Sequence, residues 1–262
     1  MNVLEFQKQK SKTKLSMVTC YDAWSAKLIA GTSVDSILVG DSLAMVMHGH
    51  STTLPANVAM MELHTQAVAR GLAGSNKLLV ADLPFISYRQ DLKTSVRAAG
   101  RMMKAGAHAV KLEGAKGNLE MIAHLVDSGI PVMGHLGLTP QSIHQLGGFK
   151  VQGNNPAEFE RIHHEAEQLE KAGCFSVVLE CVPSALAAKI TQDIKIPTIG
   201  IGAGPDTDGQ VLVLQDMLGL NEGFKPKFLR TFMSGAELMK KALNDYDTEV
   251  KKATFPTAKE SY

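Results

Sequence analysis

Four acidic side chains each stand at the end of a short apolar segment: Asp41, Asp82, Glu113 and Glu180. If those segments are the parallel strands of a closed barrel, the four carboxylates converge on the rim at the carboxyl ends of the strands, where barrel enzymes place their chemistry. Carboxylates gathered in one cleft repel one another unless protons or a cation intervene. The pattern therefore indicates a hard, oxygen-binding cation, for which Mg²⁺ is the default.

Helix capping is the ordinary alternative for any one of these acids, because a carboxylate stabilises the start of the helix that follows a strand. Asp82 fits this alternative poorly, since Leu83 and Pro84 follow it and indicate a loop. Four acids from four separate segments favour ligation or catalysis.

Two basic side chains accompany the acids. Lys111 precedes Glu113 by two residues, so the two share one face of a strand and Lys111 points into the barrel one layer below. A buried lysine needs an anionic partner. It could form an internal salt bridge, or it could hold a substrate carboxylate or balance an enolate, and both roles remain open. His135 also ends an apolar segment, as either a core histidine or a site residue.

Two other motifs carry less chemistry. His48 and His50 indicate a zinc site only weakly, because no third ligand has a fixed spacing to them. The glycine-rich run 199–204 has the spacing of a phosphate cradle, but no nucleotide-binding helix follows Pro205. We interpret this run as a place of close backbone approach.

Composition limits the partners. The chain has 27 Lys and Arg against 26 Asp and Glu, and its aromatic content is 5%, so neither nucleic acid nor an anionic membrane is an expected partner. Its three cysteines, Cys20, Cys174 and Cys181, show no Cys-x-x-Cys spacing and are expected to be reduced. There is no apolar run of transmembrane length and no secretory signal pattern, so we expect a cytoplasmic protein.

Short β-rich segments alternate with helical patterns along the chain. The predicted strands are residues 16–21, 36–40, 77–82, 109–113, 131–135, 175–180, 197–201 and 211–214, and the clearest helices are 91–105, 157–172 and 183–194. Eight alternations in this length match an α/β protein with a (β/α)8 TIM barrel better than an open doubly wound sheet. We predict one barrel domain over residues 1–262, with a frayed tail after about residue 247.

With these residues identified, the chain resembles the ketopantoate hydroxymethyltransferase family. The resemblance covers roughly residues 10–235, and its segments are 39–43, 51–55, 80–84, 110–114, 134–141, 179–183, 200–204 and 208–211. Ala44 and Ala115 stand where the family usually has glycine, which alters loop geometry and removes no charged group.

The resemblance implies a barrel of the phosphoenolpyruvate/pyruvate type, assembled as a homodecamer of two pentameric rings. It implies transfer of a hydroxymethyl group from the co-substrate 5,10-methylenetetrahydrofolate to the 2-oxo acid 3-methyl-2-oxobutanoate. The products would be ketopantoate and tetrahydrofolate, on the route to pantothenate and coenzyme A.

The same resemblance implies one Mg²⁺ per subunit. Asp41 and Asp82 would ligate the ion and, through it, the substrate, while Glu113 would act near the metal through water. Two protein carboxylates and two substrate oxygens would leave two of about six octahedral positions for water.

The remaining roles also come from the resemblance. Ser42 and Lys111 would hold the 2-oxo acid, and Glu180 would be the general base that removes the C3 proton. His135 is a candidate for a hydrogen bond near the one-carbon donor or the product alcohol.

Two other functions remain open from the sequence. One is a Mg²⁺-dependent carbon–carbon lyase or phosphonomutase of the same barrel superfamily, although the only cysteine between Asp82 and Glu180 is Cys174, in or beside a strand. The other is a catalytically silent barrel that serves as a scaffold or metabolite sensor, although none of the four acids has been lost.

Overall fold

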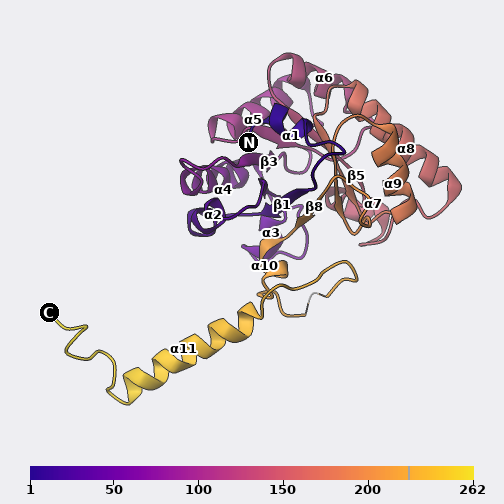
Figure 1. Ribbon diagram of the computed structural model, residues 1–262. Helices are drawn as coiled ribbons and strands as arrows, with labels where there is room; N and C mark the ends of the chain where they lie inside the picture. Colours follow the sequence, from indigo (N-terminus) through magenta and orange to yellow (C-terminus); the bar gives the residue numbers. More distant parts are fainter. Residues whose placement is uncertain (224) are drawn as a thin grey trace. The chain divides into compact units, whose positions relative to one another are not determined.

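Eight parallel strands close into a barrel, in which each strand pairs with the next and the last pairs with the first (Figure 1). The strands are β1 (Leu15–Thr19), β2 (Ser36–Val39), β3 (Leu78–Asp82), β4 (Ala109–Lys111), β5 (Val132–Gly137), β6 (Ser176–Glu180), β7 (Thr198–Ile201) and β8 (Gly209–Leu212). This computed structural model describes residues 1–223 and 225–262. Every strand overlaps one predicted from the sequence, and the (β/α)8 barrel is confirmed.

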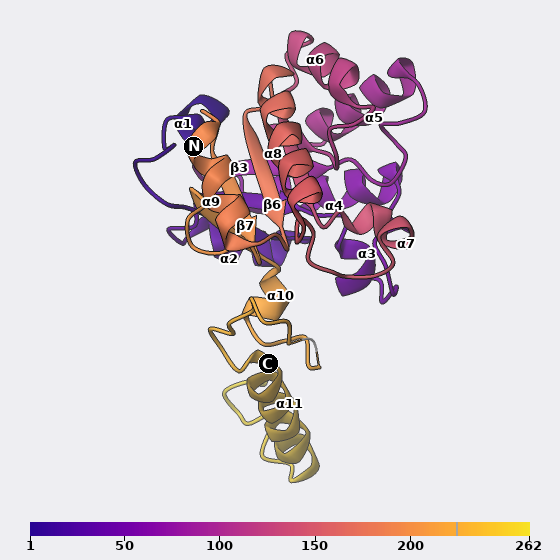
Figure 2. The same ribbon diagram turned by 90° about the vertical axis from the view of Figure 1, so that its right-hand side faces the viewer.

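Helices cover the outside of the barrel. They are α2 (Ala23–Ala30), α3 (Leu43–Val46), α4 (Val58–Gly71), α5 (Leu92–Lys104), α6 (Leu119–Asp127), η1 (Pro140–Ser142), α7 (Ile143–Leu146), α8 (Pro156–Lys171) and α9 (Ser184–Asp193). Helix α4 packs against β2 and β3, α5 against β4, and α8 against β5 and β6. Figure 2 shows α8 beside β6 on the outside of the barrel. No helix in the described part of the chain has both the length and the apolar character that a membrane crossing requires.

Capping side chains set where the long helices begin. Asn57, Asp91 and Asn155 each accept a hydrogen bond from the backbone N–H three residues further on, at the starts of α4, α5 and α8. This bond satisfies one of the N–H groups that a helix start leaves without a partner. The three clearest helices predicted from the sequence are confirmed to within one residue at each end.

The inside of the barrel is apolar at its amino-terminal end. Strand residues that alternate inward, such as Leu78, Val80 and Met133, form one buried cluster. The short helix α1 (Val3–Gln7) adds Phe6, whose ring packs edge-on against Phe175 with 5.8 Å between the ring centroids. Because this cluster fills the barrel from below, a polar site inside the barrel is left to the opposite rim.

The chain divides into two compact units, Met1–Leu212 and Val213–Tyr262. The second unit contains α10 (Leu214–Met217) and α11 (Gly235–Lys251). Helix α11 continues past residue 247, where we expected fraying, because ion pairs four residues apart support its last turns. These pairs join Lys241 to Asp245 at 2.5 Å and Lys251 to Asp247 at 2.8 Å.

Candidate active site

The four acids lie at the carboxyl ends of their strands. Asp82 and Glu180 are the last residues of β3 and β6, while Asp41 and Glu113 come two residues after β2 and β4. In β3, Asp82 lies two residues beyond the inward-facing Val80, so its side chain enters the barrel one layer above the apolar cluster. We call Asp41, Asp82, Lys111, Glu113, His135 and Glu180 the rim cluster.

A hydrogen bond and an ion pair join Asp41, Asp82 and Lys111. The Asp41 backbone N–H donates to Asp82 Oδ2 at 3.0 Å, and the Lys111 ammonium lies 2.8 Å from Asp82 Oδ1. Register explains the second contact, because Asp82 and Lys111 are paired neighbours on β3 and β4. The internal salt bridge, one of the two roles left open for Lys111, is therefore present.

His135 connects Lys111 to Glu180. Its Nδ1 lies 3.4 Å from Lys111 Nζ, and its Nε2 lies 3.2 Å from Glu180 Oε2. An ammonium group can only donate, so Nδ1 is the acceptor and Nε2 carries the proton of a neutral imidazole. That proton faces the Glu180 carboxylate, so His135 belongs to the site rather than to the apolar core.

Gln141 joins Asp41 to Glu113 through hydrogen bonds. The sequence analysis assigned this residue no role. Its Nε2 donates to Asp41 Oδ2 at 2.8 Å and to the Leu83 carbonyl at 3.0 Å, and its backbone N–H donates to Glu113 Oε2 at 3.0 Å. Its Oε1 accepts from the Tyr88 hydroxyl at 2.8 Å. The only signal in the sequence was its place at the end of the segment 134–141.

Burial sets the protonation of these groups. Burial and the charge of Asp82 raise the pKa of Asp41 to about 7, and burial and the charge of Asp41 raise the pKa of Glu113 well above its ordinary value. Burial opposes charge on Lys111, but the three surrounding acids overcome this effect and raise its pKa. Burial and the Lys111 charge lower the pKa of His135. Four carboxyl groups thus face one ammonium, and the excess negative charge calls for protons or a cation.

Glycines bring the backbones close enough for this arrangement. A Cβ on Gly40 would lie 2.8 Å from Ser42 Oγ, which is itself 2.8 Å from the Tyr21 hydroxyl. Gly137 has a φ of 92°, and a Cβ there would lie 2.2 Å from the Glu180 carbonyl oxygen. Cys181, directly after Glu180, has a φ of 47°, a strained value for a residue with a side chain and one that is frequent at functional sites.

The structure shows whether the rim acids cap helices and whether the glycine-rich run brings backbones close together. The helices that follow the acids have other N-cap residues, namely Ser42, Asp91, Asn118 and Pro183, so the rim acids do not serve as helix caps. In the glycine-rich run, a Cβ on Gly200 would meet Thr207 Oγ1 at 2.8 Å, which agrees with close backbone approach. The three cysteines are free.

The donor set fits a hard cation. Carboxylate oxygens are the ligands that Mg²⁺ prefers, and Asp82 Oδ1, although close to Lys111, accepts no hydrogen bond from the described residues. Within residues 1–223 and 225–262, no three His, Cys, Asp or Glu side chains are arranged to enclose a metal ion by themselves. Mg²⁺ in proteins commonly takes one or two carboxylates and completes its shell with water and substrate.

Of the histidine pair that weakly indicated zinc, His48 contacts His64, with 3.1 Å between the two Nε2 atoms.

Comparison with known proteins gives the relatives of this chain. The family model for ketopantoate hydroxymethyltransferase matches residues 1–258. The 3-methyl-2-oxobutanoate hydroxymethyltransferase of Coxiella burnetii (strain Dugway 5J108-111) is 61% identical, covering 98% of this chain and 96% of that protein. The enzyme of the same name from Bdellovibrio bacteriovorus is 60% identical, covering 99% of this chain and 98% of that protein.

Solved structures share the fold at low identity. The crystal structure of 2,3-dimethylmalate lyase, a PEP mutase/isocitrate lyase superfamily member, has a TM-score of 0.62 and 14% identity, covering 99% of this chain and 91% of that one. This likeness shows a shared fold and does not assign lyase chemistry. The full-length match decides between the lyase, scaffold and transferase hypotheses: this chain belongs to the ketopantoate hydroxymethyltransferase family.

Proposed function

We propose that the rim cluster carries out the ketopantoate hydroxymethyltransferase activity of this chain, with Glu180 as the general base. The reaction moves a one-carbon unit from 5,10-methylenetetrahydrofolate to 3-methyl-2-oxobutanoate. One observation carries the assignment of the base. The Glu180 side chain is 18% exposed, whereas the side chains of Asp82 and Glu113 are each 3% exposed. Of these three carboxylates, Glu180 is therefore the one that a substrate in the cleft can reach.

His135 positions this base. The proton on its Nε2 faces Glu180 Oε2, and Lys111 fixes that tautomer from the other side of the ring. The imidazole thus lies beside one carboxylate oxygen, and we assign the other, Oε1, to take the substrate proton. A neutral imidazole does this without protonating the base, and the lowered pKa of His135 keeps it neutral.

Two cationic or polar groups are available for the substrate carboxylate. Lys111 is held charged by the surrounding acids, and Ser42 is partly exposed next to the Tyr21 hydroxyl. We assign these two side chains to binding of the 2-oxo acid, which is the second role left open for Lys111.

Asp41 and Asp82 are the residues that would hold Mg²⁺, with Glu113 acting through water. When bound, Mg²⁺ supplies Lewis-acid polarisation of the keto group, which makes the C3 proton more acidic. Without a cation, the same carboxyl groups would take up protons, as the raised pKa values of Asp41 and Glu113 indicate.

Glu180 carries the substrate proton through the reaction and returns it to the product. The Glu180 carboxylate takes the C3 proton, and the electron pair stays on the substrate as an enolate. Water hydrolyses the methylene bridge of the donor, so its two carbon–nitrogen bonds break and tetrahydrofolate leaves. The enolate carbon then bonds to the released one-carbon unit, and Glu180 returns its proton to the new alkoxide.

Proton NMR in D₂O tests this assignment without folate. With Mg²⁺ present, the enzyme should replace the C3 proton of 3-methyl-2-oxobutanoate by deuterium. Glu180→Gln should slow this exchange by about 10³-fold, which is within the range for loss of a general base. Glu167→Gln, which changes a partly exposed carboxylate on α8, is the matched control. Exchange at the normal rate in Glu180→Gln would remove Glu180 from its role.

We also propose that the chain works as a homo-oligomer, with the decamer of its family as the expected size. Helix α11 supports assembly because it carries exposed apolar side chains at helical spacing: Met239, Leu243, Tyr246 and Val250. An apolar row of this kind on a surface helix is typical of a protein–protein contact. Sedimentation velocity measures the assembled mass directly.

A further inference from the structure

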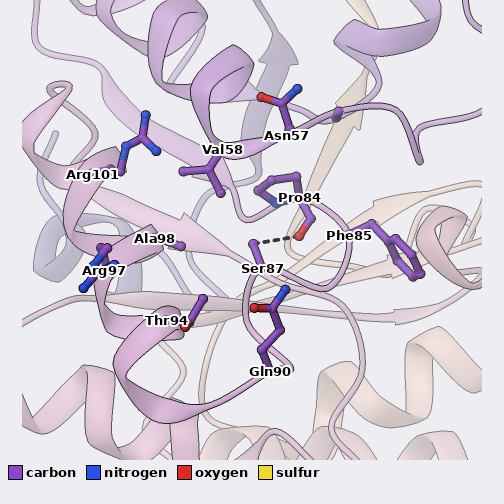
Figure 3. Close-up of a pocket in the computed structure, with 11 residues that line it drawn as sticks. Asn57, Val58, Pro84, Phe85, Ser87, Gln90, Thr94, Arg97, Ala98 and Arg101 are labelled. Carbon is purple, nitrogen blue, oxygen red and sulfur yellow. Dashed lines mark hydrogen bonds between the residues drawn. The ribbon is translucent and has the colours of Figure 1, made fainter.

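A cavity of about 280 Å³ lies in the flank of the barrel, outside the rim cluster (Figure 3). Its lining comes from the start of α4, including Asn57, from the connection between β3 and α5, including Pro84 and Phe85, and from α5. Both the start of α4 and this connection follow strand ends, so the cavity is on the catalytic side of the barrel.

The cavity carries positive charge. Arg97 and Arg101 line it from α5, four residues apart and therefore on one face of the helix, and no Asp or Glu lines it. Arg101 is paired with Glu62 through a bond of 2.9 Å from its Nε. The Arg97 side chain makes no ion pair or hydrogen bond with any residue in the described part of the chain. Its guanidinium is the charged group left available for an anion.

Two hydroxyl groups of the lining are already used within the protein, while the side-chain amides of Asn57 and Gln90 also line the cavity. The Thr94 hydroxyl donates to Asp91 at 2.9 Å, and the Ser87 hydroxyl donates to the Pro84 carbonyl at 2.7 Å. Among the lining residues, Arg97 and Arg101 carry the charge, and a guanidinium matches the two oxygens of a carboxylate with paired N–H donors.

An aromatic wall adjoins this charge. Phe85 lines the cavity and is 43% exposed, although it is a large apolar side chain. The next residue, Ile86, has a φ of 64°, which is unfavourable for a β-branched side chain. The structure thus holds a strained connection with an aromatic ring exposed beside a cationic cavity, an arrangement that suits a ligand with an aromatic ring next to carboxylates.

The same connection links the cavity to the rim cluster. Leu83, two residues before Phe85, accepts a hydrogen bond through its carbonyl from Gln141 Nε2, and the same Nε2 donates to Asp41. A ligand that extends along this connection could place one end in the cavity and the other at the cleft.

We propose that this cavity binds the glutamyl carboxylates of the folate co-substrate, with Arg97 as their main partner and Phe85 beside the aminobenzoyl ring. This inference rests on the proposed function, because it concerns the donor of that reaction. Folate has the required chemistry, since an aromatic ring is joined through an amide to a dicarboxylic amino acid. Arg101, which already pairs with Glu62, adds to the positive potential.

Steady-state kinetics of Arg97→Gln with two donors test the proposal. With 5,10-methylenetetrahydrofolate, the KM for the donor should rise about tenfold, equivalent to about 1.4 kcal/mol, while kcat and the KM for the 2-oxo acid stay unchanged. With 5,10-methylenetetrahydropteroate, which lacks the glutamyl group, Arg97→Gln and the unsubstituted enzyme should have the same KM. Lys93→Gln removes an equal charge from an exposed position on α5 that does not line the cavity, and should change neither KM.

Two results would overturn the proposal. Arg97 does not recognise the glutamyl group if Arg97→Gln leaves both donor KM values unchanged, or if it raises them by the same factor. Deuterium exchange at C3 without folate separates this failure from failure of the proposed function. Exchange should proceed normally in Arg97→Gln, whereas absence of exchange in the unsubstituted enzyme would reject the base assignment and not the cavity.

Discussion

Replacement of Gln141 by leucine should destabilise the protein and weaken the rim cluster. The substitution removes three buried side-chain hydrogen bonds, which join Gln141 to Asp41, Leu83 and Tyr88. Two neutral bonds contribute about 1 kcal/mol each and the bond to a carboxylate about 2 kcal/mol, so the loss is about 4 kcal/mol. For a chain of this size, that lowers Tm by roughly 8–16 °C. The backbone bond to Glu113 survives, which confines the damage to the Asp41 side of the cluster.

Thermal unfolding followed by circular dichroism measures the effect, with Gln192→Leu as the control. Gln192 is an exposed residue of α9, and its side chain forms no hydrogen bond to any residue in the described ranges. A surface change of this kind normally stays within about 0.5 kcal/mol. If the Tm of Gln141→Leu falls no further than that of Gln192→Leu, the three side-chain hydrogen bonds of Gln141 do not stabilise the fold.

The other predictions concern protons and the cation. The metal-free protein should lose stability as the pH rises from about 4 to about 7, because the pKa of Asp41 moves from 3.8 to about 7 on folding, so the folded state keeps a proton that the unfolded chain releases. Urea unfolding at pH 5 and pH 7.5 checks this, and higher stability at pH 7.5 would contradict it. Asp82→Ala should abolish Mg²⁺ binding in isothermal titration with the 2-oxo acid present, and unchanged affinity would exclude Asp82 as a ligand.

Much of the barrel could be predicted because its signals are local. Apolar segments such as 176–180 and helix signals such as Asn155 with Pro156 depend on a few neighbouring residues. The second unit was harder to predict, because nothing local shows that the strand pattern ends at Leu212 and that a separate helical unit follows.

The acids of the site could be predicted from the sequence, but the residues that join them by hydrogen bonds could not. Asp82 and Glu180 could be found because they end apolar strands, and the closed sheet brings such positions together. Gln141 and Tyr88 could not be found in this way. They lie in connections, and their partners Asp41 and Glu113 are 100 and 25 residues away in the chain. No periodicity relates residues at such separations.

The sequence alone determined the order of the strands, the four acids and the family. Strand patterns and family motifs consist of residues that are close together in the chain, so they can be identified without the structure. Only the tertiary structure decided that Lys111 pairs with Asp82, that His135 faces Glu180, and that Arg97 lines a cavity without a partner. These facts depend on the register between strands and on the way helices pack outside them. Both arise when the barrel closes and residues from distant parts of the chain must share one small volume.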